Sequence, residues 1–257
     1  METFVPEDSI VRTIWGKADT ILFIFAGSAA EFALNKAVDW LYFTGRLPAD
    51  PLGRLFSTVA YARQIIFSEH EDALKAIDKI TAIHQSVEAA RNAKIPDWAY
   101  RDVLFMLIDY SVRSYELLEE KLTDAQKGDV FNVFYAVGNR MGLTGLPTNY
   151  TEWLMMRDEH LQNDLLKGDL TIDLYKQYKK HLGAVRYKLL LQVQALVTPP
   201  RVSRLLGIDR LVWLRPVIGL YKFSRVIKLD GLLKQAILPQ EYKLQIQALD
   251  VKSSYKY

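Results

Sequence analysis

The sequence contains no cysteine among its 257 residues and only four histidines. Without cysteine there is no disulfide framework, no thiolate metal ligand and no cysteine nucleophile, which excludes iron–sulfur clusters and thiolate-ligated haem. The first residues, METFVPEDS, are acidic and lack the basic n-region of a signal peptide. We therefore expect a cytoplasmic protein in a reducing compartment.

Long hydrophobic runs and a strong excess of one charge are also missing. The longest apolar runs, 21–27 and 211–220, fall well short of the roughly 20 residues that a membrane-spanning helix needs. The net charge of +3 is too small to indicate nucleic-acid binding. Half of the residues are hydrophobic and a quarter are charged, as in an ordinary globular protein. No convincing domain boundary interrupts the chain, so we predict a single domain over 1–257.

Helical periodicity dominates the sequence, and alternating strand-like runs are scarce. Two capping boxes, Ser68 with Glu71 and Thr123 with Gln126, indicate helix starts. Gly142–Asn149 is rich in Gly, Pro and Asn, which predicts a loop. The spacing predicts helices over 26–45, 54–67, 68–90, 96–121, 123–141, 150–166, 171–197 with a break at Gly183, and 208–234. The fold class is therefore all-α, a single globular domain of roughly ten helices.

One histidine lies in an unusual setting, the helical segment KITAIHQSVE around His84. It sits within or beside an apolar stripe, so it is either a hydrogen-bonded core residue or a ligand of a metal or cofactor. Neither H-E-x-x-H nor Glu-x-x-His occurs, which argues against zinc-hydrolase and di-iron sites. Walker, G-x-S-x-G and G-x-G-x-x-G motifs are absent too. A haem held by one imidazole stays compatible with the residues, and both interpretations remain open.

Two further features carry charge where it is unexpected. Asp109 follows the apolar run 103–108, and a carboxylate there is costly unless it is paired. It either pairs with Arg113 one turn later or accepts a hydrogen bond from a ligating imidazole or a substrate. Segment 201–228 carries seven basic residues against one aspartate, with three aromatic residues between them. It forms either a solvated helix face or a peripheral membrane contact.

The order of several short motifs resembles a known family. Asp50-Pro-Leu-Gly-Arg54 is followed by Thr58, by Ala82-Ile-His84-Gln-Ser-Val87 and by Met141-Gly-Leu-Thr-Gly-Leu-Pro147. This series is similar to the catalytic domain shared by rubber oxygenase (latex-clearing protein) and the mycophenolic-acid-pathway oxygenase. The similar region covers about residues 10–165, and we expect the C-terminal helices of 166–257 to pack on it.

The resemblance implies an all-α domain that encloses a haem-sized apolar pocket with b-type haem. His84 would be the axial ligand of the haem iron, with Arg54 and Thr58 beside the haem as cofactor-binding and catalytic groups. Asp109 is then the candidate that would accept a hydrogen bond from the ligating imidazole and so orient it. The implied function is oxidation of a small apolar substrate, isoprenoid- or lipid-like, with O₂.

The chain also departs from that family. Ser57 stands where rubber oxygenase has a lysine that can reach the iron, and no residue matches the family's catalytic carboxylate, so polyisoprene is not the expected substrate. A second hypothesis therefore stays open. In it the chain is a non-enzymatic protein that binds a lipid or terpenoid, or a haem carrier or sensor, with 201–228 facing a membrane.

Overall fold

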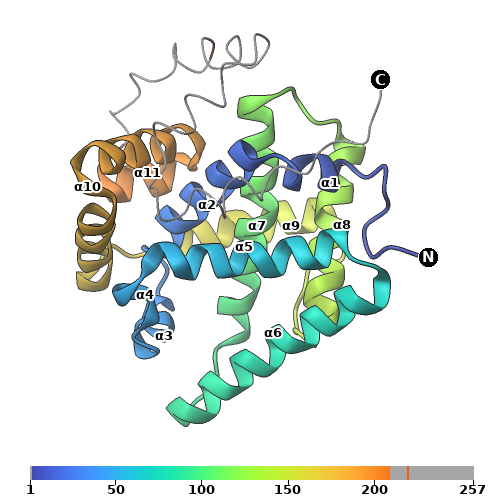
Figure 1. The fold of residues 1–257 in the computed structure, drawn as a ribbon, viewed down its shortest axis with the longest axis horizontal. Coiled ribbons are helices and arrows are strands. Elements are labelled where there is room, and N and C mark those ends of the chain that lie inside the picture. The colour runs from blue at the N-terminus through green and yellow to red at the C-terminus, as the bar shows by residue number, and fades with distance from the viewer. Residues whose placement is uncertain (1, 209–218, 220–257) are drawn as a thin grey trace.

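The computed structural model describes residues 2–208 and 219, and these confirm the predicted all-α class (Figure 1). Within this part the chain forms two isolated β-bridges and no sheet. The helices of the described residues are α1 (Ile10–Trp15), α2 (Ala18–Phe32), α3 (Val38–Phe43), α4 (Arg46–Ala49), α5 (Pro51–Phe67), α6 (His70–Arg91), α7 (Asp97–Leu118), α8 (Asp124–Arg140), α9 (Tyr150–Asn163), α10 (Asp169–Val197) and α11 (Pro200–Leu206).

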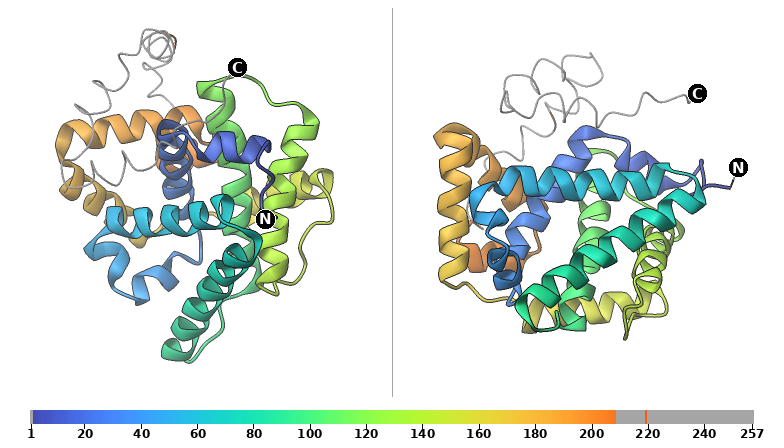
Figure 2. Two further views of the ribbon diagram at one scale, coloured as in Figure 1. Left: turned by 45° about the vertical axis from the view of Figure 1, so that its right-hand side comes forward. Right: turned by 60° about the horizontal axis from the view of Figure 1, so that its bottom comes forward.

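Helix α7 runs through the middle of the molecule, with other helices on several sides of it (Figures 1 and 2). Its apolar run 103–108 is buried except at Val103 and Leu107, as a helix surrounded by others requires. Trp15 from α1 is fully buried, and its Nε1 donates to Ser111 Oγ of α7 at 3.1 Å. Helix α7 is therefore the scaffold that positions the side chains described below.

Helices α5 and α6 form a V in which α6 turns back along α5 and diverges toward its C-terminal end (Figure 1). Asp50 begins α5 by accepting a hydrogen bond from the Gly53 N–H at 2.8 Å, and Pro51 occupies the first helical position. The helix therefore starts three residues before the predicted residue 54. This start fixes the direction in which Arg54 and Thr58 point.

Helices α2 and α7 pack tightly against each other at Gly27. A Cβ atom on Gly27 would overlap the ring of Tyr110 and lie 3.0 Å from Val197 Cγ1. The Tyr110 ring cannot move easily, because its hydroxyl donates to buried Glu31 at 2.8 Å. We expect Gly27→Ala to lower the free energy of unfolding by about 1–3 kcal/mol through overpacking, as measured by urea denaturation.

Gly128 in α8 supplies the matched control for this prediction. A Cβ there would meet no atom within 4 Å, and alanine is favoured over glycine in a helix by about 1 kcal/mol. Gly128→Ala should therefore leave stability unchanged or raise it. Equal effects of the two variants would show that α2 and α7 have room to separate.

The predicted continuous helix over 26–45 is wrong, because the chain turns between α2 and α3. The side chain of Asn35 accepts from the Ala37 N–H at 2.7 Å, which stabilises a local turn in competition with the helix. The Leu166 N–H also donates to the Leu34 carbonyl at 2.7 Å, and Asn35 forms a β-bridge with Leu165. A contact with a segment 130 residues away thus ends α2. The sequence around Asn35 does not by itself indicate this contact.

The predicted capping box at Ser68 and Glu71 is also wrong. Ser68 ends α5, and α6 begins one residue later than such a box requires, after Glu69. The N-terminal segment explains the shift, because the His70 N–H donates to the Glu2 carbonyl at 3.0 Å and Thr3 bridges to Glu69. Tertiary pairing has replaced the local cap.

Three other local predictions are confirmed. Thr123 and Gln126 form the reciprocal capping box of α8. Residues 142–149 form a loop, and α10 is broken at Gly183, whose φ of 73° is left-handed. The predicted helix 208–234 and most of the basic segment 201–228 lie outside the described residues.

Candidate functional site

Arg54 and Thr58 lie one turn apart on α5 and contact each other. Arg54 Nη1 donates to Thr58 Oγ1 at 2.7 Å and to Ser57 Oγ at 3.3 Å. Both hydroxyls in turn donate to the Arg54 carbonyl. Arg54 is half-buried, yet it forms no ion pair with any carboxylate in the described part of the chain. Its guanidinium is therefore a partly desolvated cation, and this burial lowers its pKa.

His84 lies in the C-terminal half of α6, where the V of α5 and α6 is open. Burial lowers the pKa of its imidazole, and the positive charge of Arg54 lowers it further. Of the three site residues predicted from the sequence, Arg54 and Thr58 are in contact on α5, and Arg54 lies near enough to His84 on α6 for its charge to lower the pKa of the imidazole. At neutral pH the imidazole is uncharged, which is the form that can ligate a metal.

The imidazole of His84 has few polar contacts within the described structure. Nδ1 is buried without a hydrogen bond of normal geometry. The charge of Glu88 and a contact with the Ile80 carbonyl one turn earlier raise the pKa of the ring, but less than burial and Arg54 lower it. The imidazole therefore differs from a core histidine whose hydrogen bonds are satisfied. A neutral imidazole beside an unpaired guanidinium fits a haem, which needs one nitrogen for its iron and a cation for a propionate.

The ring of Tyr100, on the first turn of α7, packs against the imidazole of His84. Its ring meets His84 edge to face, with centroids 5.2 Å apart and an interplanar angle of 89°. Its hydroxyl donates to Glu88 Oε1 at 3.2 Å, and Glu88 also accepts from Lys94 Nζ and the Ile95 N–H. Burial and the Glu88 charge raise the pKa of Tyr100, so it remains a neutral donor.

Asp109 lies in a different part of α7. It accepts from Arg113 Nε at 2.6 Å, which is the pair expected from their spacing. It also accepts from Arg157 of α9 at 2.8 Å, and neither contact involves His84. Within the described structure Asp109 thus belongs to an ion-pair network, and its role behind a ligating imidazole stays a hypothesis.

That network is the largest feature that sequence reasoning missed. Arg157 donates through both terminal nitrogens to Glu31 of α2, and His160 Nε2 lies 2.9 Å from the same carboxylate. Glu31 is fully buried, and Arg157 and His160 are only 4% and 3% exposed. Burial by itself would raise the pKa of Glu31, but Arg157 and His160 outweigh it and hold the pKa at about 2.

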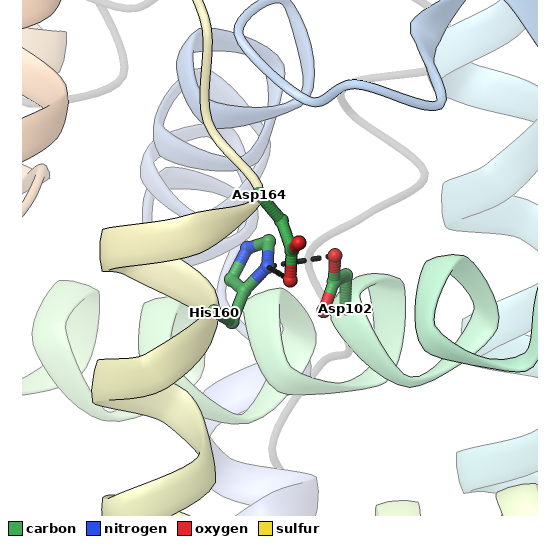
Figure 3. Close-up of side chains that lie close together, drawn as sticks. All are labelled: Asp102, His160 and Asp164. Carbon is green, nitrogen blue, oxygen red and sulfur yellow. Dashed lines mark hydrogen bonds and ion pairs between the residues drawn. The ribbon is translucent and has the colours of Figure 1, made fainter.

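The second nitrogen of His160 faces two aspartates (Figure 3). Nδ1 lies 2.7 Å from Asp102 Oδ2 and 3.4 Å from Asp164 Oδ2. Burial lowers the pKa of His160, but the hydrogen bonds to Asp102 and Glu31 exceed this and raise it to about 9. The two histidines are thus opposites, because His84 is neutral and unpaired whereas His160 is held among carboxylates.

These features define an all-α domain with a neutral, unpaired histidine beside a desolvated arginine. Residues 15–228 match the family model that describes the catalytic domain of the ER-bound oxygenase mpaB/B′ and rubber oxygenase. The chain therefore belongs to this family of oxygenase catalytic domains. The match reaches well beyond residue 165, where the recognisable motifs fade. No curated protein and no solved structure matches the chain.

None of the helices within the described residues combines the length and the apolar character needed to span a bilayer.

Proposed function

We propose that the protein is a b-type haem-dependent oxygenase that acts with O₂ on a small apolar, isoprenoid- or lipid-like substrate in the cytoplasm. The observation that supports this proposal is His84, an imidazole that burial keeps neutral, whose Nδ1 has no hydrogen bond of normal geometry and whose pKa is lowered further by the charge of Arg54. Membership of an oxygenase family supports the same reaction class.

Each residue of the site has a distinct part in this proposal. His84 would ligate the iron through one ring nitrogen, and the Ile80 carbonyl of its own helix would hold the other. Tyr100 packs edge-on against the ring and restricts its rotation. Arg54 would bind a propionate or stabilise negative charge on a polar group in the site, and Thr58 orients the guanidinium by accepting from it.

The haem, when bound, supplies O₂ activation, and the protein supplies ligation, orientation and an apolar enclosure. The residues that hold the haem would come from α5, α6 and the start of α7. Ser57 forms its hydrogen bonds with Arg54 of its own turn. A serine is too short to ligate the iron as the lysine of rubber oxygenase can, so Ser57 would not take part in holding the haem.

An absorption spectrum of protein expressed with a haem precursor tests the proposal. We expect the wild-type protein to show a strong Soret band and His84→Ala to lose or shift it, because the variant lacks the axial ligand. The control is His181→Ala, which removes an exposed histidine of α10 and should leave the spectrum unchanged. Circular dichroism of all three proteins checks that they are folded.

Two other outcomes would change the conclusion. A colourless wild-type protein that cannot be reconstituted with haemin would overturn the haem proposal and favour a protein that binds an apolar ligand without chemistry. A red protein that consumes no O₂ in the presence of a reductant and isoprenoid or lipid substrates would favour a haem carrier or sensor. Both alternatives were left open by the sequence.

A further inference from the structure

Asp102, His160 and Asp164 converge at the end of α9 (Figure 3). One ligand atom from each residue lies within 4.8 Å of the other two. We propose that these three side chains form a binding site for a divalent transition-metal ion, with Zn²⁺ as the best match. Such a site would tie α7 to the segment that follows α9.

The orientation of His160 is the main reason for this proposal. Its Nε2–H donates to Glu31 at 2.9 Å, and Glu31 is itself held by Arg157 and Tyr110. A buried carboxylate behind the imidazole is the arrangement that fixes the tautomer and the ring plane of metal-ligating histidines. It leaves Nδ1 directed at the two aspartates. Asp102 is fixed as well, because Asn35 Nδ2 donates to it at 3.2 Å.

The spacing of the ligand atoms agrees with a tetrahedral ion. Zinc lies about 2.0–2.2 Å from nitrogen and oxygen ligands, so two ligand atoms of a tetrahedron are roughly 3.4 Å apart. The distance from His160 Nδ1 to Asp164 Oδ2 is 3.4 Å, and that to Asp102 Oδ2 is 2.7 Å. The second distance has to open by roughly 0.7 Å to reach the tetrahedral spacing, which a rotation of the Asp102 side chain can supply.

The charge of the surrounding network favours a dication. Four carboxylates meet here, from Glu31, Asp102, Asp109 and Asp164, and two arginines, Arg113 and Arg157, pair with them. Two negative charges remain when His160 is neutral. A divalent ion cancels both, whereas a proton on His160 cancels only one. On binding, the ion takes the place of the proton on Nδ1, which is released to solvent.

The site is also reachable and has the right ligand types. The Asp164 side chain is 27% exposed, whereas those of His160 and Asp102 are 2% and 4% exposed, so an ion can enter from the Asp164 side. One imidazole and two carboxylates suit zinc, and a fourth position remains for water. The alternative occupant is a proton, with His160 as an imidazolium that donates to the aspartates.

Calorimetric titration of the full chain, first stripped with EDTA and then titrated with ZnCl₂, tests the site. We expect one strong equivalent in the wild-type protein and an affinity at least about tenfold weaker in Asp164→Asn. Asp164 is partly exposed, so this variant should fold. Asp158→Asn, an exposed change on the same helix, and His84→Ala should both keep the wild-type affinity.

The melting temperature gives a second readout. Zinc should raise it in the wild-type protein and not in Asp164→Asn, because the ion would join two separate segments. Equal affinity and equal stabilisation in both proteins would overturn the proposal and place the bound ion elsewhere. The absence of binding in the wild-type protein would also overturn it and assign the cluster to a protonated histidine.

Discussion

Replacing Arg157 with methionine should lower the free energy of unfolding by about 3–5 kcal/mol, the cost of leaving buried charges unpaired. Arg157 is 4% exposed and donates to both Glu31 and Asp109. Burial by itself would lower the pKa of Arg157, but the two carboxylates raise it, so the guanidinium is always charged. Methionine fills a similar volume but provides no donor, so two buried carboxylates would lose their main partner.

Arg113→Met is the matched control. Arg113 pairs with the same Asp109 at 2.6 Å, but its side chain is 38% exposed. Ion pairs at such positions contribute less than about 1 kcal/mol, because water and salt screen them. Urea denaturation of the three proteins at pH 7 measures the difference. Losses of similar size would contradict the expectation and indicate that water reaches Glu31 when Arg157 is removed.

The Arg157 network and the proposed haem site share one helix. Helix α7 carries Tyr100 against His84 at its start and Asp102, Asp109 and Tyr110 in the network further along. The network joins α7 to α2 and α9, and therefore fixes the helix from which Tyr100 projects. Removing one partner of such a network is costly, whereas apolar residues of equal volume in place of the whole network often stabilise as well.

The proposed haem site could be predicted from the sequence because its parts are local. Arg54 and Thr58 are four residues apart on one helix, and their contact follows directly from that spacing. His84 is recognisable from its place in an apolar stripe and from the order of the family motifs. That Arg54 lies close enough to lower the pKa of His84 is added by the structure, since it depends on how α6 turns back along α5.

The buried network could not be predicted in the same way. Glu31 is 126 residues from Arg157 and 129 from His160, and nothing local links them. Two weak signals exist in retrospect, a glutamate within the small and apolar stretch of α2 and a basic pair three residues apart on α9. The early end of α2 at Asn35 has the same origin, because its contact with Leu165 brings α9 and α2 together.

Lowering the pH should destabilise the protein steeply through Glu31. Its pKa is about 2 in the folded protein against 4.5 for the ordinary group. A carboxyl with a lowered folded pKa contributes stability above its unfolded pKa and loses it as the pH falls toward the folded value. We therefore expect the free energy of unfolding to fall by about 3 kcal/mol between pH 5 and pH 2 because of this one residue.

Glu31→Gln separates this contribution from that of the other carboxyl groups. The amide keeps the shape of the side chain and part of the contact with Arg157, but it does not titrate. The variant should be less stable at pH 7 and lose less stability on acidification, so the two curves converge near pH 2. Denaturation of both metal-free proteins at several pH values measures this. Parallel curves would mean that Glu31 takes up no proton in this range on unfolding, and that other carboxyl groups cause the acid sensitivity.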